Sequence, residues 1–316
     1  HHINRNKVTH GTNSWNKKLG CMDIREKLVK RGVWFRTDSM SSEQAVAFSQ
    51  RLENLNYSAL WLPESTGRDP FVHMALLASH TSELIFATGI ANIYHRHPGM
   101  TKQSAATLAE MSNNRFLLGL GVSHAPIVEG IRQLNYSNPL KSMRQYLEAM
   151  QHSPYTAIPP SIEPPCVLAA LGPKMLELAG EYTDGAHPYF TTPEHTAMAK
   201  EILGEGKMLC VEQKVAITTN RDVAHDVARS SYSRHASLPN YRNNWKRLGF
   251  TDEDIGQGTD RFLDAIVAWG TPDQINTRLA EHEEAGATHI CIHPLNTEPE
   301  SEESLWETLE VLAPSV

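Results

Sequence analysis

Polar residues stand at the end of an apolar, strand-like stretch in the middle of the chain. RFLLGLGVSHAP, residues 115–126, passes through Gly119 and Gly121 and delivers Ser123 and His124. Glycines let a backbone turn tightly or approach a planar ligand, because no Cβ stands in the way. An imidazole exchanges protons near neutral pH, so His124 is a candidate acid–base group. The competing interpretation is a glycine-softened strand end with a solvent-facing histidine.

Two other apolar stretches end in residues that can do chemistry. LIFATGIANIYHRHP, residues 84–98, passes Gly89-Ile90 and then reaches a cluster of His95, Arg96 and His97. LWLPESTGRDP, residues 60–70, ends its apolar part at Glu64. A carboxylate at a partly buried rim has a raised pKa and can carry a proton. The alternative is an ordinary loop carboxylate that pairs with Arg68 in solvent.

A third kind of site is indicated by ALGPKMLELAG, residues 170–180. A strand stops here and a helix opens over Gly172, Pro173 and Lys174. Free amides at a helix start, with a lysine nearby, form an anion site that suits a phosphate. The alternative is a common Gly-Pro helix start with an exposed lysine.

The histidines near strand ends raise the question of a metal. His289, Cys291 and His293 alternate along the last predicted strand, and imidazole and thiolate are zinc donors. No carboxylate joins them, and a period-two strand explains their spacing. The sequence therefore predicts no metal site. His187 and Tyr189, emerging from another strand, are expected to shape a substrate pocket.

Composition limits the class of partner. The 316 residues carry a formal net charge of -7, which argues against a nucleic-acid or anionic-membrane surface and favours small molecules. Four cysteines without paired spacing indicate reduced thiols in a cytoplasm. No 18-residue apolar run is present to span a bilayer. Residues 1–21 are polar and without periodicity, so we expect a disordered leader or an expression remnant ahead of a single domain at 22–316.

Strand-like and helix-like stretches alternate along nearly the whole chain. Eight apolar stretches are predicted strands, near 32–35, 57–63, 84–92, 115–122, 166–171, 185–190, 208–219 and 289–294. Helices lie between them, as where Ser41 and Gln44 form a capping box. Eight βα units predict an α/β fold, a (β/α)8 TIM barrel, with a doubly wound sheet as the alternative for the first four strands. The long connections 124–165 and 221–260 are expected to be insertion segments at the C-terminal rim; the second contains Tyr241, Trp245 and Phe250, a possible lid.

The order of these blocks resembles the luciferase-like monooxygenase superfamily, in its branch of oxidoreductases that use the deazaflavin coenzyme F420. The resemblance covers about residues 32–296. Residues 84–98 look like the family's third strand and residues 115–126 like its fourth. Residues 167–190 look like its fifth strand, phosphate-side helix and sixth strand.

The resemblance implies a set of site residues. A non-proline cis peptide behind the cofactor ring would fall at Gly89-Ile90. Contacts to the ring and its tail would fall on Val122, Ser123 and His124, and contacts to the phosphate on Gly172, Pro173 and Lys174. His124 and Glu64 are the candidates for the proton that accompanies hydride transfer, while His187, Tyr189 and Trp245 would meet the substrate.

One departure from the family leaves the substrate open. The F420 enzymes that oxidise sugar phosphates carry an Asp-His pair after the second strand, and Glu64 and Ser65 stand at those positions. The resemblance also implies a homodimer. Alternatives are an FMN-dependent monooxygenase on the same fold, a zinc-dependent barrel hydrolase, and a flavin-binding protein without turnover.

Overall fold

Eight parallel strands close into a barrel, as the sequence predicts. The computed structural model describes residues 23–29, 31–298 and 301–315, so the predicted leader lies outside the described residues. Each strand pairs with the next, and β10 pairs with both β8 and β1, which closes the ring. The barrel strands are β1 Gly32–Trp34, β2 Ala59–Leu62, β3 Ile85–Thr88, β5 Phe116–Gly121, β6 Cys166–Leu168, β7 Gly185–Ala186, β8 Met208–Ile217 and β10 His289–Pro294.

Two further strands join the sheet: β9 was not predicted, whereas β4 lies within the single strand predicted at 84–92, which the structure divides after Thr88. β4, Ala91–Asn92, continues the path of β3 and pairs with β5. β9, Val267–Gly270, pairs with the last four residues of β8. Because β9 follows directly after a helix, without an intervening turn residue, nothing in the sequence separates the two elements.

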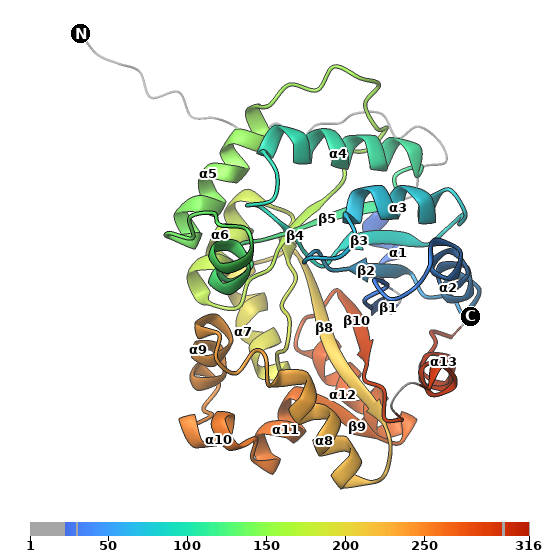
Figure 1. The fold of residues 1–316 in the computed structure, drawn as a ribbon, viewed down its shortest axis with the longest axis vertical. Coiled ribbons are helices and arrows are strands. Elements are labelled where there is room, and N and C mark those ends of the chain that lie inside the picture. The colour runs from blue at the N-terminus through green and yellow to red at the C-terminus, as the bar shows by residue number, and fades with distance from the viewer. Residues whose placement is uncertain (1–22, 30, 299–300, 316) are drawn as a thin grey trace.

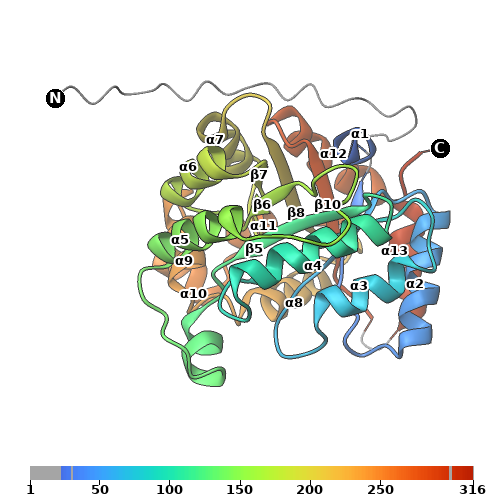
Figure 2. The ribbon, with the colours of Figure 1, turned by 90° about the horizontal axis from the view of Figure 1, so that it is seen from above.

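Helices surround the strands (Figures 1 and 2). They are α2 Ser42–Asn54, α3 Pro70–Ala78, α4 Pro98–Met111, α5 Pro139–His152, α6 Pro173–Tyr182, α7 Pro193–Leu203, α12 Pro272–Glu284 and α13 Glu302–Val311. Most begin with proline, whose missing N–H costs nothing in a first turn. The predicted capping box of Ser41 and Gln44 is present at the start of α2. No helix among the described residues is both long and apolar enough to cross a membrane.

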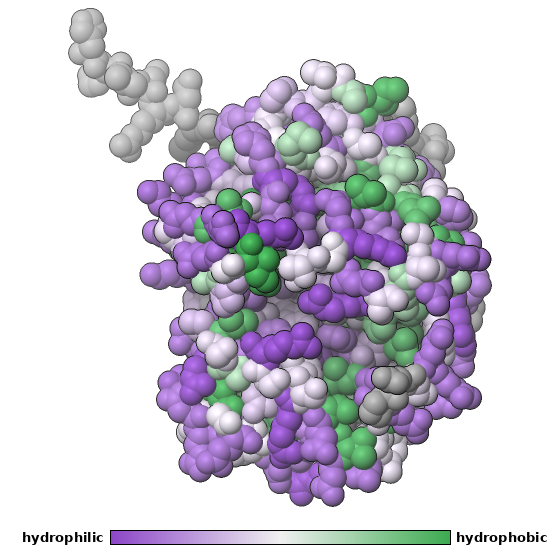
Figure 3. All heavy atoms as spheres, viewed as in Figure 1, coloured by the Kyte–Doolittle hydropathy of each residue, from purple (hydrophilic) through white to green (hydrophobic). Residues whose placement is uncertain are grey.

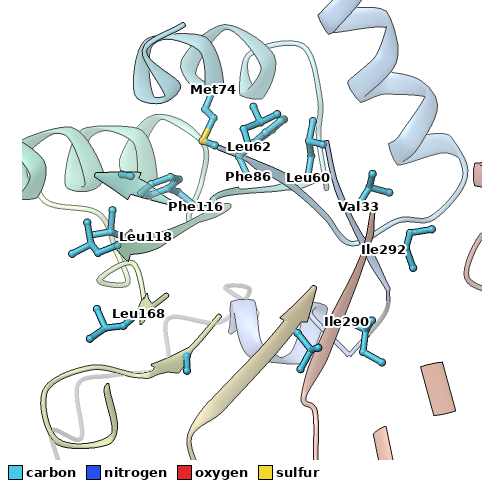
Figure 4. Close-up of a cluster of buried hydrophobic side chains, with 14 of the residues drawn as sticks. Val33, Leu60, Leu62, Met74, Phe86, Phe116, Leu118, Leu168, Ile290 and Ile292 are labelled. Atoms are coloured by element: carbon cyan, nitrogen blue, oxygen red, sulfur yellow. The ribbon is translucent and has the colours of Figure 1, made fainter. Parts of the chain in front are cut away.

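Period-two alternation divides the strand side chains into two layers. Val33, Leu60, Phe86 and Phe116 point outward to the helices, and Met74 of α3 lies close to Phe86 (Figure 4). The inward layer is apolar at the amino end of the barrel, where Trp61 packs among alanines, cysteines and the residues of the short helix α1, Ile24–Lys27. The same alternation sends the inward positions near the carboxyl ends of the strands to one rim.

The two long connections have different structures. Residues 221–266 form α8 Arg221–Tyr232, α9 Pro239–Arg247, α10 Asp252–Gln257 and α11 Asp260–Ile266, which lie together in Figure 1 and share a separate aromatic core with Phe190. This insertion is therefore a packed helical cap. Residues 124–165, in contrast, contain the barrel helix α5 and a single π-helical turn at Pro126–Ile131, so only part of this connection is an insertion.

Side chains on the face shown in Figure 3 are mostly hydrophilic, and the apolar ones form small separate groups. This distribution is ordinary for a protein surface, on which single apolar residues are common. The polar and titratable side chains that could form a site lie at the carboxyl ends of the barrel strands.

Candidate functional site

A cis peptide joins Gly89 and Ile90 between β3 and β4, at the position that the family resemblance implies. Its carbonyl and the one that follows are both hydrogen-bonded: Trp34 Nε1 donates to Gly89 O at 3.0 Å, and the Glu64 amide donates to Ile90 O at 3.2 Å. A Cβ on Gly89 would lie 2.7 Å from Trp34 Nε1, so the close indole requires glycine there. The peptide is thus fixed at the rim by β1 and β2.

The glycines of the GLGVSH stretch serve a different purpose from the one expected. β5 continues as a strand through Gly121, and neither Gly119 nor Gly121 has a positive φ. A Cβ on Gly119 would lie 2.0 Å from Thr88 O, and one on Gly121 would lie 2.4 Å from the Ile90 side chain. The glycines therefore make room for β3 and Ile90, and the expected tight turn at these glycines is wrong.

The chain bends two residues after Gly121, at Ser123. Ser123 has a left-handed φ of 54°, and its carbonyl accepts a hydrogen bond from Tyr136 Oη at 3.1 Å. His124 follows, half-buried, with its ring centroid 5.6 Å from that of Tyr241 in the cap. Burial lowers the pKa of His124, so the imidazole is neutral at neutral pH. Val122 packs against the outer core beside them.

Glu64 is held in an ion pair. Its carboxylate accepts from Arg96 Nη1 at 2.9 Å, from Arg96 Nη2 at 2.5 Å and from the Asn92 amide at 2.7 Å. Arg96 also reaches Asp69 at 2.9 Å, and only 6% of the Glu64 side chain is exposed. A carboxylate with all these donors is suited to fixing the loops after β2 and β4, which favours a positioning role for Glu64.

The start of α6 presents free backbone amides. Its N-cap residue, Gly172, makes no side-chain capping bond, and Lys174 is exposed in the first turn. Arg247, at the end of α9, places Nη2 3.7 Å from the position of a Cβ on Gly172. Among the described residues Arg247 has no acidic partner and donates only to Asn244. A helix start with two cations nearby fits a phosphate.

Arg247 is not a residue that the sequence singles out. It ends a basic helix in the inserted segment, and only the packing of the cap brings it to α6. The exposed basic end of NWKRLGF was the one available signal.

The three predicted substrate residues have different surroundings. His187 is buried under the cis peptide: its ring stacks on Trp61 at 4.2 Å, Nδ1 bonds Cys210 O at 2.8 Å, and Nε2 has no partner in the described part of the chain. Trp245 is fully buried and donates to Phe190 O at 3.1 Å, which favours a packing role. Tyr189 is partly exposed among the rim aromatics, as expected of a pocket wall.

Three charged or titratable side chains meet where β8 and β10 end, and the sequence had indicated only one of them. Lys214 Nζ lies 2.6 Å from Glu212 Oε1, and His293 Nδ1 lies 2.8 Å from the same oxygen. Phe190 donates its amide to Glu212 Oε2 at 3.0 Å. Lys214 Nζ also lies 3.8 Å from the ring centroids of both Tyr189 and Phe190. The signal for Glu212 and Lys214 was the spacing of two charges within a strand of apolar residues.

Burial and mutual attraction set the protonation of this cluster. Burial alone would raise the pKa of Glu212, but Lys214 and His293 lower it to about 2. Burial lowers the pKa of Lys214 to about 8, although Glu212 opposes the shift. Burial and the nearby ammonium lower the pKa of His293 to about 4. At neutral pH the cluster holds a carboxylate, an ammonium and a neutral imidazole.

The alternating His289, Cys291 and His293 do not converge on an ion. His289 bonds Leu28 O through Nδ1 at 2.8 Å and Trp61 Nε1 through Nε2 at 3.0 Å, so both of its nitrogens are engaged. Cys291 donates to Val211 O, and burial raises its pKa well above the usual value. Within 23–29, 31–298 and 301–315 no group of three His, Cys, Asp or Glu residues is placed to share a metal.

The rim residues fit a phosphorylated cofactor with a planar ring. The cis peptide lies next to the end of β5, where a Cβ on Gly121 would meet the Ile90 side chain, and α6 offers amides and cations for a phosphate. The unpartnered Nε2 of His187 beneath Gly89 is a polar atom for which the described residues provide no hydrogen bond.

Comparison with known proteins identifies the family. The model of the luciferase-like monooxygenase family matches residues 28–289. A 5,10-methylenetetrahydromethanopterin reductase of Archaeoglobus fulgidus is 26% identical over 310 residues, which cover 83% of this chain and 92% of the relative.

Two solved structures share the fold. One is an F420-dependent secondary alcohol dehydrogenase in complex with an F420-acetone adduct, with a TM-score of 0.69 and 14% identity over 90% of this chain and 96% of that chain. The other is the oxygenating constituent of 3,6-diketocamphane monooxygenase, from the CAM plasmid of Pseudomonas putida, in complex with FMN, with a TM-score of 0.67, 15% identity and the same coverage of both chains. Together with the family match over most of its length, this fold identifies the chain as a member of the luciferase-like monooxygenase family.

Proposed function

We propose that this protein is an F420-dependent oxidoreductase that transfers a hydride between the deazaflavin and a small organic substrate. The observation that carries the proposal is the start of α6, where free amides, Lys174 and Arg247 form an anion site beside the cis peptide. A coenzyme F420-dependent oxidoreductase of Mycobacterium tuberculosis, named as putative and 25% identical over 84% of this chain, supports F420 by sequence, whereas the FMN enzyme is matched by its fold.

The long acidic tail of F420 also calls for more cations than FMN does. Arg96 is committed to Glu64 and Asp69, so it is not available to a tail. Lys174 and Arg247 are exposed and lack acidic partners in the part of the chain that the structure describes. We therefore assign the phosphate and the near part of the tail to Gly172, Pro173, Lys174 and Arg247.

The remaining rim residues hold the ring and exclude water. Gly89 and Ile90 support one face of the ring, and Val122, Ser123 and His124 flank it. The bound deazaflavin supplies the carbon that carries the hydride. His124, neutral at neutral pH, is the hydrogen-bonding partner that we assign to the cofactor side of the reaction, and Tyr189 bounds the substrate.

Titration of one preparation with F420 and with FMN tests the cofactor. We expect F420 to bind one equivalent per chain and more tightly than FMN. Preference for FMN would support the FMN-dependent monooxygenase instead, and binding of neither would refute a flavin or deazaflavin enzyme. Bound F420 without turnover of any substrate would indicate a cofactor-binding protein.

His124→Ala tests the rim assignment on the same samples. We expect weaker F420 binding or slower turnover, because the imidazole lies between the cofactor wall and Tyr241. A variant with unchanged affinity and unchanged turnover would remove His124 from the site.

We further propose that the chain works as a homodimer in the cytoplasm. Val72 on α3 and Met111 on α4 are exposed apolar residues on barrel helices, as the proposed interface requires. Light scattering of the purified protein gives the mass in solution, and a monomer at micromolar concentration would contradict the dimer.

A further inference from the structure

His293 is the accessible member of a cluster that is otherwise sealed inside the barrel. The side chain of His293 is 18% exposed, whereas those of Glu212 and Lys214 are 0% and 1% exposed. The imidazole stacks on Trp34 at a centroid distance of 4.5 Å, and Trp34 in turn donates to the cis peptide at Gly89 O. His293 therefore lies beside the proposed ring site.

The position of the ring proton of His293 follows from its partner. The carboxylate of Glu212 only accepts hydrogen bonds, so the contact of 2.8 Å requires a proton on Nδ1. Lys214 Nζ lies 3.4 Å from the same nitrogen but donates to Glu212 Oε1 at the much shorter distance of 2.6 Å, so the carboxylate is the closer partner of both groups. A neutral imidazole with its proton on Nδ1 presents a lone pair at Nε2, and Nε2 has no partner among the described residues.

We propose that Nε2 of His293 accepts the hydroxyl proton of an alcohol substrate while the hydride leaves the carbon that bears the hydroxyl. This assignment rests on the proposed F420 function. The C–H bond breaks with its electron pair going to the deazaflavin, the O–H bond breaks with its proton going to Nε2, and a C=O bond forms. The products are a ketone or aldehyde, an imidazolium and the reduced cofactor, and the reverse reaction reduces the carbonyl compound.

The hydrogen-bonding capacity of Nε2 fits an alcohol, since the charges of Glu212 and Lys214 behind the imidazole cancel. An alcohol is neutral and donates one hydrogen, which matches the single lone pair of Nε2. Glu212, bonded to Nδ1, stabilises the imidazolium that forms, as a carboxylate does behind a catalytic histidine in other enzymes.

The tautomer is measured first, on the full chain labelled with ¹⁵N-histidine. The His293 signals are identified by their loss in His293→Gln. We expect a proton on Nδ1 and none on Nε2 in the unmodified protein, with this preference weakened in Glu212→Gln. A proton on Nε2 in the unmodified protein would overturn the assignment.

Turnover is measured next, with the F420-loaded protein and 2-propanol, cyclohexanol and their ketones as probes. We expect His293→Gln to slow hydride transfer at least about 100-fold while the F420 affinity stays within about twofold. The matched control is His225→Gln. His225 lies on α8 and is also paired with a carboxylate, that of Asp264 at 2.8 Å, and we expect its replacement to leave turnover unchanged.

The outcomes separate the two proposals. Failure of F420 to bind the unmodified protein refutes the proposed function. F420 binding with no reaction of any alcohol or ketone refutes the substrate class, and equal turnover of His293→Gln and the unmodified protein refutes the role of His293. Impaired turnover together with impaired F420 binding would make His293 a structural residue, which also overturns the proposal.

Discussion

Replacing Lys214 by methionine should expose how much of the fold depends on the buried cluster. Glu212 has a pKa of about 2 in the folded chain against an ordinary 4.5, a shift that stabilises the fold by about 3 kcal/mol at neutral pH. The pKa of Lys214 is about 8 against 10.5, which costs about the same amount. The Glu212–Lys214 attraction enters both shifts and counts only once, so desolvation largely offsets it in the intact pair, as is common for buried ion pairs.

The single replacement breaks this balance. In Lys214→Met, burial raises the pKa of Glu212 above its ordinary value, so the folded state resists ionisation. Such a group costs nothing below pH about 4.5, where the folded and unfolded chains are both protonated. Its cost grows as pH rises above that value and levels off once pH exceeds the folded pKa. We expect a loss of about 3 kcal/mol at pH 7 that shrinks to below about 1 kcal/mol at pH 5.

Urea unfolding of the variant and the unmodified protein at pH 5, 6 and 7 measures this difference. The double variant Lys214→Met with Glu212→Gln should recover to within about 1 kcal/mol of the unmodified protein, because no buried charge remains. Lys27→Met is the control: Lys27 pairs with Glu83 at the surface, where such pairs contribute about 0–1 kcal/mol. A deficit that is independent of pH, or a double variant no more stable than the single one, would refute the reasoning.

Three other replacements test the rim. Arg247→Ala should weaken F420 binding about tenfold or more in a fluorescence titration, while the adjacent Lys246→Ala should not; equal effects would contradict the phosphate assignment. Gly121→Ala should lower the free energy of unfolding by about 1–3 kcal/mol because its Cβ meets Ile90, whereas Gly130→Ala, with open space around its Cβ, should change it by less than about 0.5 kcal/mol. Glu64→Gln should destabilise the protein by about 1–3 kcal/mol and leave the shape of the pH–rate profile unchanged; loss of one limb of that profile would mean that Glu64 carries a proton after all.

The barrel could be predicted because its information is local. Each of the eight strands is a short run of apolar residues bounded by turn or cap residues, and the capping box at Ser41 marks a helix start by sequence alone. β9 was not predicted because its sequence, VAWG, follows α11 directly, with no turn or cap residue between the two elements. The sequence indicated the helical cap only through the length of the connection and its aromatic residues. Its fold was not predicted, because its core forms when α8 to α11 pack against Phe190.

Features of the proposed site can be predicted where one segment supplies them and not where two segments meet. The cis peptide at Gly89-Ile90 lies within a single segment that resembles the family, and its position is confirmed, whereas the role of Ser123-His124 stays a prediction. Arg247 reaches Gly172 only through the fold of the cap. The glycine stretch shows the same limit, because the need for small residues comes from Ile90 on a neighbouring strand rather than from a ligand.

The same dependence on neighbouring strands explains why Glu212 and Lys214 come together with His293. β8 and β10 are paired in parallel with Glu212 opposite Cys291 and Lys214 opposite His293, so Lys214 and His293 are neighbours and Glu212 is two residues earlier on the same face of β8. Glu212 fixes the ring proton of His293 on Nδ1, and Lys214 keeps the low pKa of the imidazole. In the proposed reaction a proton taken up at Nε2 would therefore be passed on readily, because the adjacent ammonium disfavours the imidazolium. The Glu212 carboxylate orients the imidazole of His293, and the Lys214 ammonium favours release of the proton from Nε2, so each buried charge has a separate part in turnover.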